Sequence, residues 1–162
     1  MAVRPWADWP WSRPGLVWHA VCIARVMHVL VVDQSPTMRR IVINTLGQMG
    51  CHDCHEAGSG VEAIRSLVAL PIGLVILQRH LPDMSGVDLA RALRRKEATR
   101  DIGIVMVTKN ESEDEILAAR RVGVTEWVVV PLNANILKTK IATAMRGVCL
   151  AAGSALQQVA SA

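Results

Sequence analysis

The sequence has no apolar run long enough to cross a membrane. Its nearest candidate, residues 15–24, falls short of the roughly 18 apolar residues that a span needs, and His19 interrupts it. No small-residue cleavage pattern follows, so this stretch does not resemble a secretory signal peptide. We therefore expect no membrane partner.

The sequence also has only a small excess of positive charge and few cysteines. The net charge is +4, and residues 1–26 hold +2 of it, with three arginines against one aspartate. Because the remainder is close to neutral and has no long basic run, we expect no nucleic-acid partner. The four cysteines are not spaced as in a secreted disulfide scaffold, which favours free thiols in a reducing cytoplasm.

The composition, 51% hydrophobic and 20% charged over 162 residues, is that of one globular domain. Regular patterning begins at Met27. Residues 1–26 hold four of the five tryptophans and show no helical or strand period, so we interpret them as a disordered or non-native extension. The alternative is an arm whose tryptophans anchor to a partner or a membrane surface. Residues 148–162 form an Ala/Ser-rich tail.

Strand-like and helical segments alternate between these ends. Strands are predicted at 28–33, 51–57, 73–78, 102–107 and 125–130. Helices are predicted at 36–49, after Ser59, after Ser85, after Ser112 and at about 133–145, with Ser-x-x-Glu capping boxes at Ser59 and Ser112. Three strands are continuous apolar runs, as in a parallel sheet covered on both faces. Five strand–helix units in a row predict a doubly wound α/β domain.

Polar residues follow several of these strands. Asp33 and Gln34 end the first strand, Gln78 ends the third, and Thr108 follows the fourth. Val130 ends the fifth, before a proline. Since open parallel sheets carry their chemistry at the carboxyl ends of the strands, these positions are the candidate site.

Five motifs carry a family resemblance. They are VLVVDQSPTMRRIV (29–42), GSGVEA (58–63), LPDMSG (81–86), VMVTKN (105–110) and GVTEWVVVPL (123–132). In order and spacing, residues 27–147 resemble the receiver domain of bacterial two-component response regulators, nearest to the single-domain chemotaxis type. The resemblance implies a flavodoxin-like fold with five helices and five parallel strands in the order 2-1-3-4-5.

The family transfers a phosphoryl group from a histidine kinase to an aspartate, with Mg²⁺ held by nearby acids. By resemblance, the phosphoacceptor position is Gln78, and the acidic pair falls on Asp33 and Gln34. The two positions that bind phosphoryl oxygens, a hydroxyl and a lysine, fall on Thr108 and Val130. Three of these five positions therefore depart from the family pattern.

These departures agree with one another chemically. An amide such as Gln78 has no anionic oxygen to attack phosphorus, and Asp33 alone is a poor Mg²⁺ site. Val130 removes the cation that would balance phosphate charge. We therefore expect a pseudo-receiver with no catalytic residue, no enzyme activity, no cofactor, and weak or absent Mg²⁺ binding. We also expect the amides of Gln34 and Gln78 to donate hydrogen bonds to Asp33.

The resemblance also implies a partner surface. It would comprise the helix after Ser112, the fifth strand and the last helix, around the aromatic switch position Trp127, and would contact a histidine kinase or a motor or output protein. Trp127 is equally explained as a surface anchor or as half-buried strand packing. Pro131 matches a family proline that follows a cis peptide bond.

Two alternatives remain open. Asp33 is the only carboxylate at the pocket positions and would be the acceptor of an unorthodox response regulator. The stretch Cys51 to His55 matches a haem-attachment pattern and offers ligands for a metal or thiols for redox chemistry. In a strand over 51–57, alternation would separate Cys51 from Cys54, which favours ordinary strand residues over a metal site. Arg39 and Arg40 are interpreted as a solvated helix face.

Overall fold

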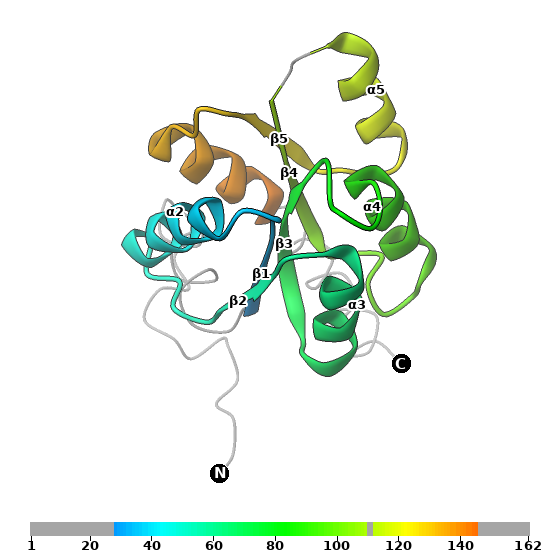
Figure 1. Cartoon of the computed structure of the whole chain (residues 1–162), viewed down its shortest axis with the longest axis horizontal. Coiled ribbons are helices and arrows are strands. Elements are labelled where there is room, and N and C mark those ends of the chain that lie inside the picture. Colours follow the sequence, from blue (N-terminus) through cyan, green and yellow to red (C-terminus); the bar gives the residue numbers. More distant parts are fainter. Residues whose placement is uncertain (1–27, 110–111, 146–162) are drawn as a thin grey trace, which may run out of the picture.

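The computed structural model describes residues 28–109 and 112–145. Within them a five-stranded parallel sheet has the order β2-β1-β3-β4-β5, as predicted. The strands are β1 (His28–Val32), β2 (Cys54–Ala57), β3 (Ile72–Gln78), β4 (Gly103–Thr108) and β5 (Glu126–Val129). Figure 1 shows the sheet as the centre of the molecule, with helices on both sides.

The central strands are buried along nearly their whole length. All six residues of β4 are buried, and so are Val29 to Val32 of β1. Strands buried on both faces need apolar side chains at successive positions, which explains the continuous apolar runs. The second strand was predicted too long: it begins at Cys54, three residues later than expected. Its polar composition limits it to a short edge strand.

The helices begin where the sequence signals predict. They are α2 (Pro36–Gln48), α3 (Gly60–Ala69), α4 (Gly86–Arg95), α5 (Glu113–Arg121) and a helix over 134–145. Ser35 and Ser59 cap α2 and α3 through their hydroxyl oxygens, which accept from the N–H groups of Met38 and Glu62. The capping box predicted at Ser112 is not formed, because the Ser112 side chain makes no cap hydrogen bond.

Two apolar clusters hold the layers together. On one face of the sheet, α2 and the helix 134–145 pack Leu46, Leu137 and Ile141 against alternate strand residues. On the other face, α3, α4 and α5 contribute residues such as Leu89 and Ala119. Figure 1 shows the same division, with the cyan and orange helices on one side of the sheet and the green and yellow helices on the other.

The chain ends are not part of this description. Both the segment 1–26, predicted as an extension, and the tail 148–162 lie outside the described residues. Among the residues that are described, none of the helices is long and apolar enough to span a membrane.

Candidate functional site at the carboxyl ends of the strands

Asp33 follows β1 and is buried, with only 5% of its surface exposed. Its Oδ1 accepts a 2.7 Å hydrogen bond from the Ser35 N–H, which ties the carboxylate to the start of α2. Burial raises the pKa of Asp33 above the usual aspartate value, and this effect outweighs the Ser35 hydrogen bond and the nearby cations, which lower it. The carboxylate is therefore held in place but is costly to ionise.

Gln34 and Gln78 lie at the ends of the neighbouring strands β1 and β3 and are joined by a hydrogen bond. The side-chain oxygen Oε1 of Gln78 accepts from the backbone N–H of Gln34 at 3.1 Å. This corrects the expectation that both amides donate to Asp33: among the described residues, the hydrogen bond of Gln78 goes to the backbone instead. The Gln34 side chain is exposed. The Gln78 side-chain oxygen Oε1, the atom that would face a metal as a ligand, already accepts the hydrogen bond from the Gln34 N–H.

Thr108 and Val130 close the site on the side of β4 and β5. Thr108 is buried, and its carbonyl oxygen accepts from the Val130 N–H at 3.0 Å. Val130 is partly buried and packs against the apolar cluster beneath α2 and the helix 134–145. The Val130–Pro131 peptide bond is cis. The position that we predicted to match the family's lysine therefore holds an apolar side chain that packs against the core.

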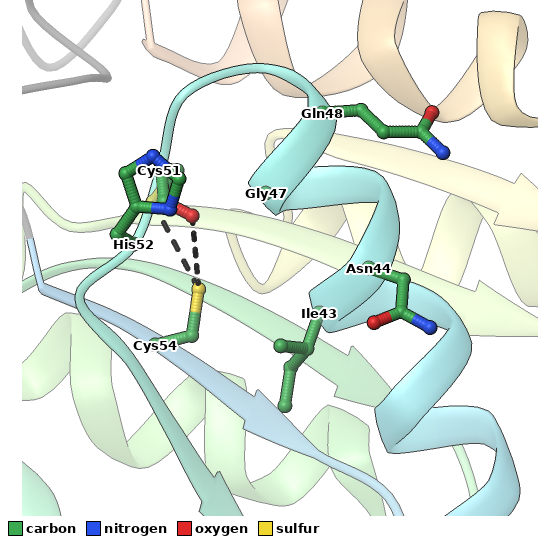
Figure 2. Close-up of a pocket in the computed structure, with 7 residues that line it drawn as sticks. All are labelled: Ile43, Asn44, Gly47, Gln48, Cys51, His52 and Cys54. Carbon is green, nitrogen blue, oxygen red and sulfur yellow. Dashed lines mark hydrogen bonds between the residues drawn. The ribbon is translucent and has the colours of Figure 1, made fainter.

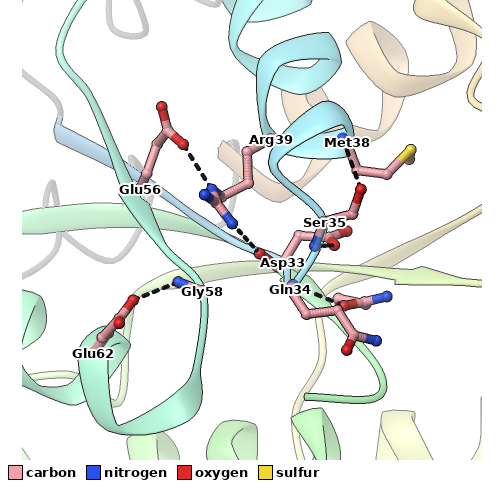
Figure 3. A network of polar contacts seen from close by, with 9 residues as sticks. Asp33, Gln34, Ser35, Met38, Arg39, Glu56, Gly58 and Glu62 are labelled. Carbon is pink, nitrogen blue, oxygen red and sulfur yellow. Dashed lines mark hydrogen bonds and ion pairs between the residues drawn. The ribbon is translucent and has the colours of Figure 1, made fainter. Parts of the chain in front are cut away.

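Two cations approach Asp33 from elsewhere. Arg39 on α2 donates from its guanidinium to the Asp33 backbone oxygen at 2.7 Å and pairs with Glu56 of β2 at 2.6 Å (Figure 3). Lys109 follows β4 and, with Arg39, lowers the pKa of Asp33 electrostatically. The interpretation of Arg39 as a solvated residue was wrong. Its partner, Glu56, is 17 residues away along the chain, so no local pattern identifies the pair.

The loop between β3 and α4 is tied to its surroundings by Asp83 and Gly86. The two carboxylate oxygens of Asp83 accept from the N–H groups of Gly60 and Val61 at 2.8 Å, which lowers the pKa of Asp83 and caps α3 from outside. Gly86 lies so close to the backbone carbonyl oxygen of Gln78 that a Cβ atom at position 86 would collide with it. Glycine at this position therefore lets the loop fold back over the end of β3.

Trp127 lies on β5 near two cationic side chains. The Arg120 guanidinium of α5 lies 4.6 Å from the ring centroid, and the Lys140 ammonium of the last helix lies 5.1 Å from it. Lys140 also pairs with Glu126 at 2.8 Å. The ring packs partly against the core. The indole is therefore half-buried strand packing, and its role as a surface anchor for a partner stays a prediction.

A narrow cavity joins Trp127 to the site. Its lining residues include Thr108, Met106, Ala119 and Trp127, and its volume of about 10 Å³ is near the room that one water molecule needs. Arg79, in the loop after β3, pairs with Glu115 of α5 at 3.1 Å beside this cavity. The polar site and the Trp127 surface are thus adjacent through Thr108.

The cysteine–histidine stretch lies away from this site. Cys54 pairs with Val29 at the beginning of β1, whereas Asp33 follows the end of β1. The stretch therefore lies toward the amino ends of the strands, opposite the site. Because β2 begins at Cys54, strand alternation does not separate Cys51 from Cys54, and their sulfur atoms lie 3.9 Å apart. No group of three or more metal-ligating side chains occurs in 28–109 or 112–145.

The architecture defines the class of protein. Five parallel strands in this order, with the polar residues at the carboxyl ends of β1, β3 and β4, form a flavodoxin-like receiver fold. Residues 29–142 match the family described as the response regulator receiver domain.

Similar proteins and a solved structure agree with this family assignment. The chain is 38% identical over 116 residues to the chemotaxis protein CheY1 of Helicobacter pylori, covering 71% of this chain and 94% of that protein. It is 36% identical to the chemotaxis protein CheY of Pseudomonas aeruginosa, over 71% of this chain and 93% of that one. The structure of CheY4 of Vibrio cholerae superposes with a TM-score of 0.68 at 28% identity, over 74% of this chain and 99% of that one. This chain belongs to the response regulator receiver family.

Proposed function

We propose that this protein is a pseudo-receiver of the two-component, chemotaxis-like type, which acts in the bacterial cytoplasm by binding other signalling proteins without accepting a phosphoryl group. The observation that carries the proposal is Gln78. It occupies the end of β3, where the family has its phosphoacceptor, and its side-chain oxygen is hydrogen-bonded to the Gln34 N–H. An amide in that position lacks the anionic oxygen that would attack phosphorus.

The residues of the site do not fit Mg²⁺. Hard divalent cations prefer charged oxygen ligands, and the three positions at the ends of β1 and β3 supply one carboxylate and two amides. The carboxylate, Asp33, already accepts from Ser35, and burial raises its pKa. We therefore derive no metal-dependent step, and we propose that the protein acts without a cofactor and is not an enzyme.

A phosphorylation assay tests this proposal. The purified full chain is incubated with acetyl phosphate and Mg²⁺, and its mass is measured intact. We expect no phosphorylated species. The matched control is the triple variant Gln34→Asp, Gln78→Asp, Val130→Lys, which restores the family's charged groups and should gain one phosphoryl group in a Mg²⁺-dependent reaction.

Phosphorylation of the wild-type chain in the same assay would contradict the proposal. The variant Asp33→Asn then identifies the acceptor. Loss of the modification in this variant would establish Asp33 as an unorthodox acceptor, and its persistence would point to another residue.

The surface around Trp127 is proposed to bind the partner. Arg120 and Lys140 place positive charge around the half-buried indole, and the neighbouring helices expose Leu117 and Ile136, at 47% and 52% of their surface. A centre of aromatic and apolar groups with a charged rim is typical of protein interfaces. The expected partners are a histidine kinase and a motor or output protein.

Site-specific photocrosslinking in the source cells tests the surface. A crosslinking amino acid at Leu117, on α5, should capture a kinase, motor or output protein. The same amino acid at Val68, on α3, is the matched control, because Val68 is apolar and 80% exposed but lies away from β5. Equal capture of these proteins from both positions would remove the support for a surface centred on Trp127.

A further inference from the structure

A pair of thiols lies outside the site described above. Cys51 follows α2, and Cys54 is the first residue of β2. The Cys54 sulfur is 3.9 Å from the Cys51 sulfur and 3.7 Å from the Cys51 carbonyl oxygen, as the dashed lines in Figure 2 show. Cys51 is buried and Cys54 is partly exposed, and neither forms a disulfide in this structure.

The local backbone holds the two thiols near each other. The Cys51 N–H donates to the Leu46 carbonyl oxygen at 3.0 Å, at the end of α2. The Val29 N–H donates to the Asp53 carbonyl oxygen at 2.9 Å, which attaches the intervening loop to β1. A disulfide has a sulfur–sulfur bond of about 2.05 Å, so the sulfurs need to approach by a distance that side-chain rotation and a small loop movement can supply.

Small molecules have access to this pair. An open groove of about 580 Å³ is lined by Cys51 and Cys54 together with residues of the last turns of α2 and the following loop, among them Ile43, Asn44 and His52 (Figure 2). The groove is large enough to admit a peptide-sized thiol reagent, and both cysteines reach its wall.

We propose that Cys51 and Cys54 form a redox-active dithiol that closes to an intramolecular disulfide by exchange with a small disulfide in this groove. The more exposed Cys54 loses its proton to solvent and attacks one sulfur of the small disulfide, whose S–S bond breaks and releases one thiolate. Cys51, deprotonated in turn, attacks the Cys54 sulfur of the mixed disulfide and releases the second thiolate. The dithiol is oxidised by two electrons, and the small disulfide is reduced to two thiols as its thiolates take up the two protons.

The sequence provides an unambiguous readout. Trypsin cleaves after Arg40 and Arg65, and residues 41–65 contain no other lysine or arginine, so both cysteines lie in one peptide that has no further cysteine. The native full chain is treated with excess oxidised glutathione, quenched with acid, alkylated and digested. We expect the peptide 41–65 to become lighter by two hydrogen atoms and to escape alkylation, and we expect excess reduced glutathione to reverse both changes.

Two matched variants separate the steps. In Cys51→Ser the second step is lost, so the peptide should instead accumulate a glutathione adduct on Cys54. In Cys54→Ser the first step is lost, and glutathionylation should be at least tenfold slower than in Cys51→Ser. If the native wild-type peptide keeps two alkylatable thiols, or stops at a glutathione adduct without closing, the proposal is wrong. These results do not depend on the phosphorylation assay, which tests the proposed function separately.

Discussion

Asp33 and Asp83 are two aspartates at the same end of the sheet whose environments shift their pKa values in opposite directions. Burial dominates at Asp33 and raises its pKa. At Asp83, which is exposed, hydrogen bonds from the Gly60 and Val61 N–H groups dominate and lower its pKa. The two side chains should therefore contribute to stability with opposite dependence on pH.

Asp33→Asn should stabilise the protein at neutral pH, by up to about 1 kcal/mol. Because the folded pKa is raised, the contribution of Asp33 is fully present below the ordinary aspartate pKa and is lost as the pH rises through the raised value. The amide removes this loss, and its oxygen can still accept from Ser35. Thermal melts from about pH 3 to pH 8 should show the variant's advantage growing with pH. A variant that melts at a lower temperature than the wild type at pH 7 would contradict this explanation.

Asp83→Asn should lower the melting temperature at pH 7, because an amide can supply only one acceptor to the two N–H groups that the carboxylate caps. The folded pKa is lowered, so the contribution of Asp83 is present above the ordinary value and disappears as the pH falls through the lowered value. The difference between variant and wild type should therefore shrink in acid, and melts over the same pH series measure it. A difference that stays constant down to pH 2 would show that the charge plays no part.

At the scale of elements, close approach between the β3–α4 loop and the end of β3 depends on one glycine. Gly86→Ala should destabilise the protein by about 1–3 kcal/mol, because the new methyl group meets the Gln78 carbonyl oxygen and Arg79 backbone atoms. Gly47→Ala is the matched control, since Gly47 lies within α2 with no atom within 4 Å of an added Cβ. It should gain about 0.5–1 kcal/mol from helix propensity. Denaturant unfolding measures both, and equal effects would refute the steric argument.

Arg94 illustrates how an element's surroundings override its sequence pattern. It is one of four basic residues among positions 91–96, at the end of α4, and such a cluster is usually expected to be a solvated cationic edge. The structure instead directs its guanidinium to the carbonyl oxygens of Gly123, Arg100 and Ile102, at 2.7–3.0 Å. Partial burial lowers the pKa of Arg94. The carbonyl acceptors come from the loops that precede β4 and β5, so the helix alone does not indicate them.

For the whole molecule, stability should be indifferent to Mg²⁺. A cation that binds only the folded state raises stability by about 2.7 kcal/mol at a hundredfold excess over its dissociation constant. We expect no measurable change in melting temperature of the wild type up to millimolar Mg²⁺. The double variant Gln34→Asp, Gln78→Asp restores two carboxylates beside Asp33 and should show a concentration-dependent rise. Differential scanning fluorimetry measures both, and a saturable rise in the wild type would mean that the amides still build an ion site.

The order and type of the elements could be read from the sequence because their causes are local. Apolar runs as in 103–108 specify buried parallel strands, and serine caps such as Ser35 and Ser59 mark helix starts. The least regular strand, β2, was the one placed poorly, because a short edge strand of polar residues has little apolar pattern to detect. The positions of Asp33, Gln78 and Thr108 at one edge follow from the same parallel arrangement.

The contacts within the site were decided by tertiary structure alone. Arg39 joins Glu56 and the Asp33 backbone, and Gln78 directs its side-chain oxygen to the Gln34 N–H. Each depends on where a side chain points once the helices have packed, and several equally good partners exist in the sequence. Periodicity and capping record the short-range preferences of the chain, whereas these pairings depend on the packing of segments that are distant along it.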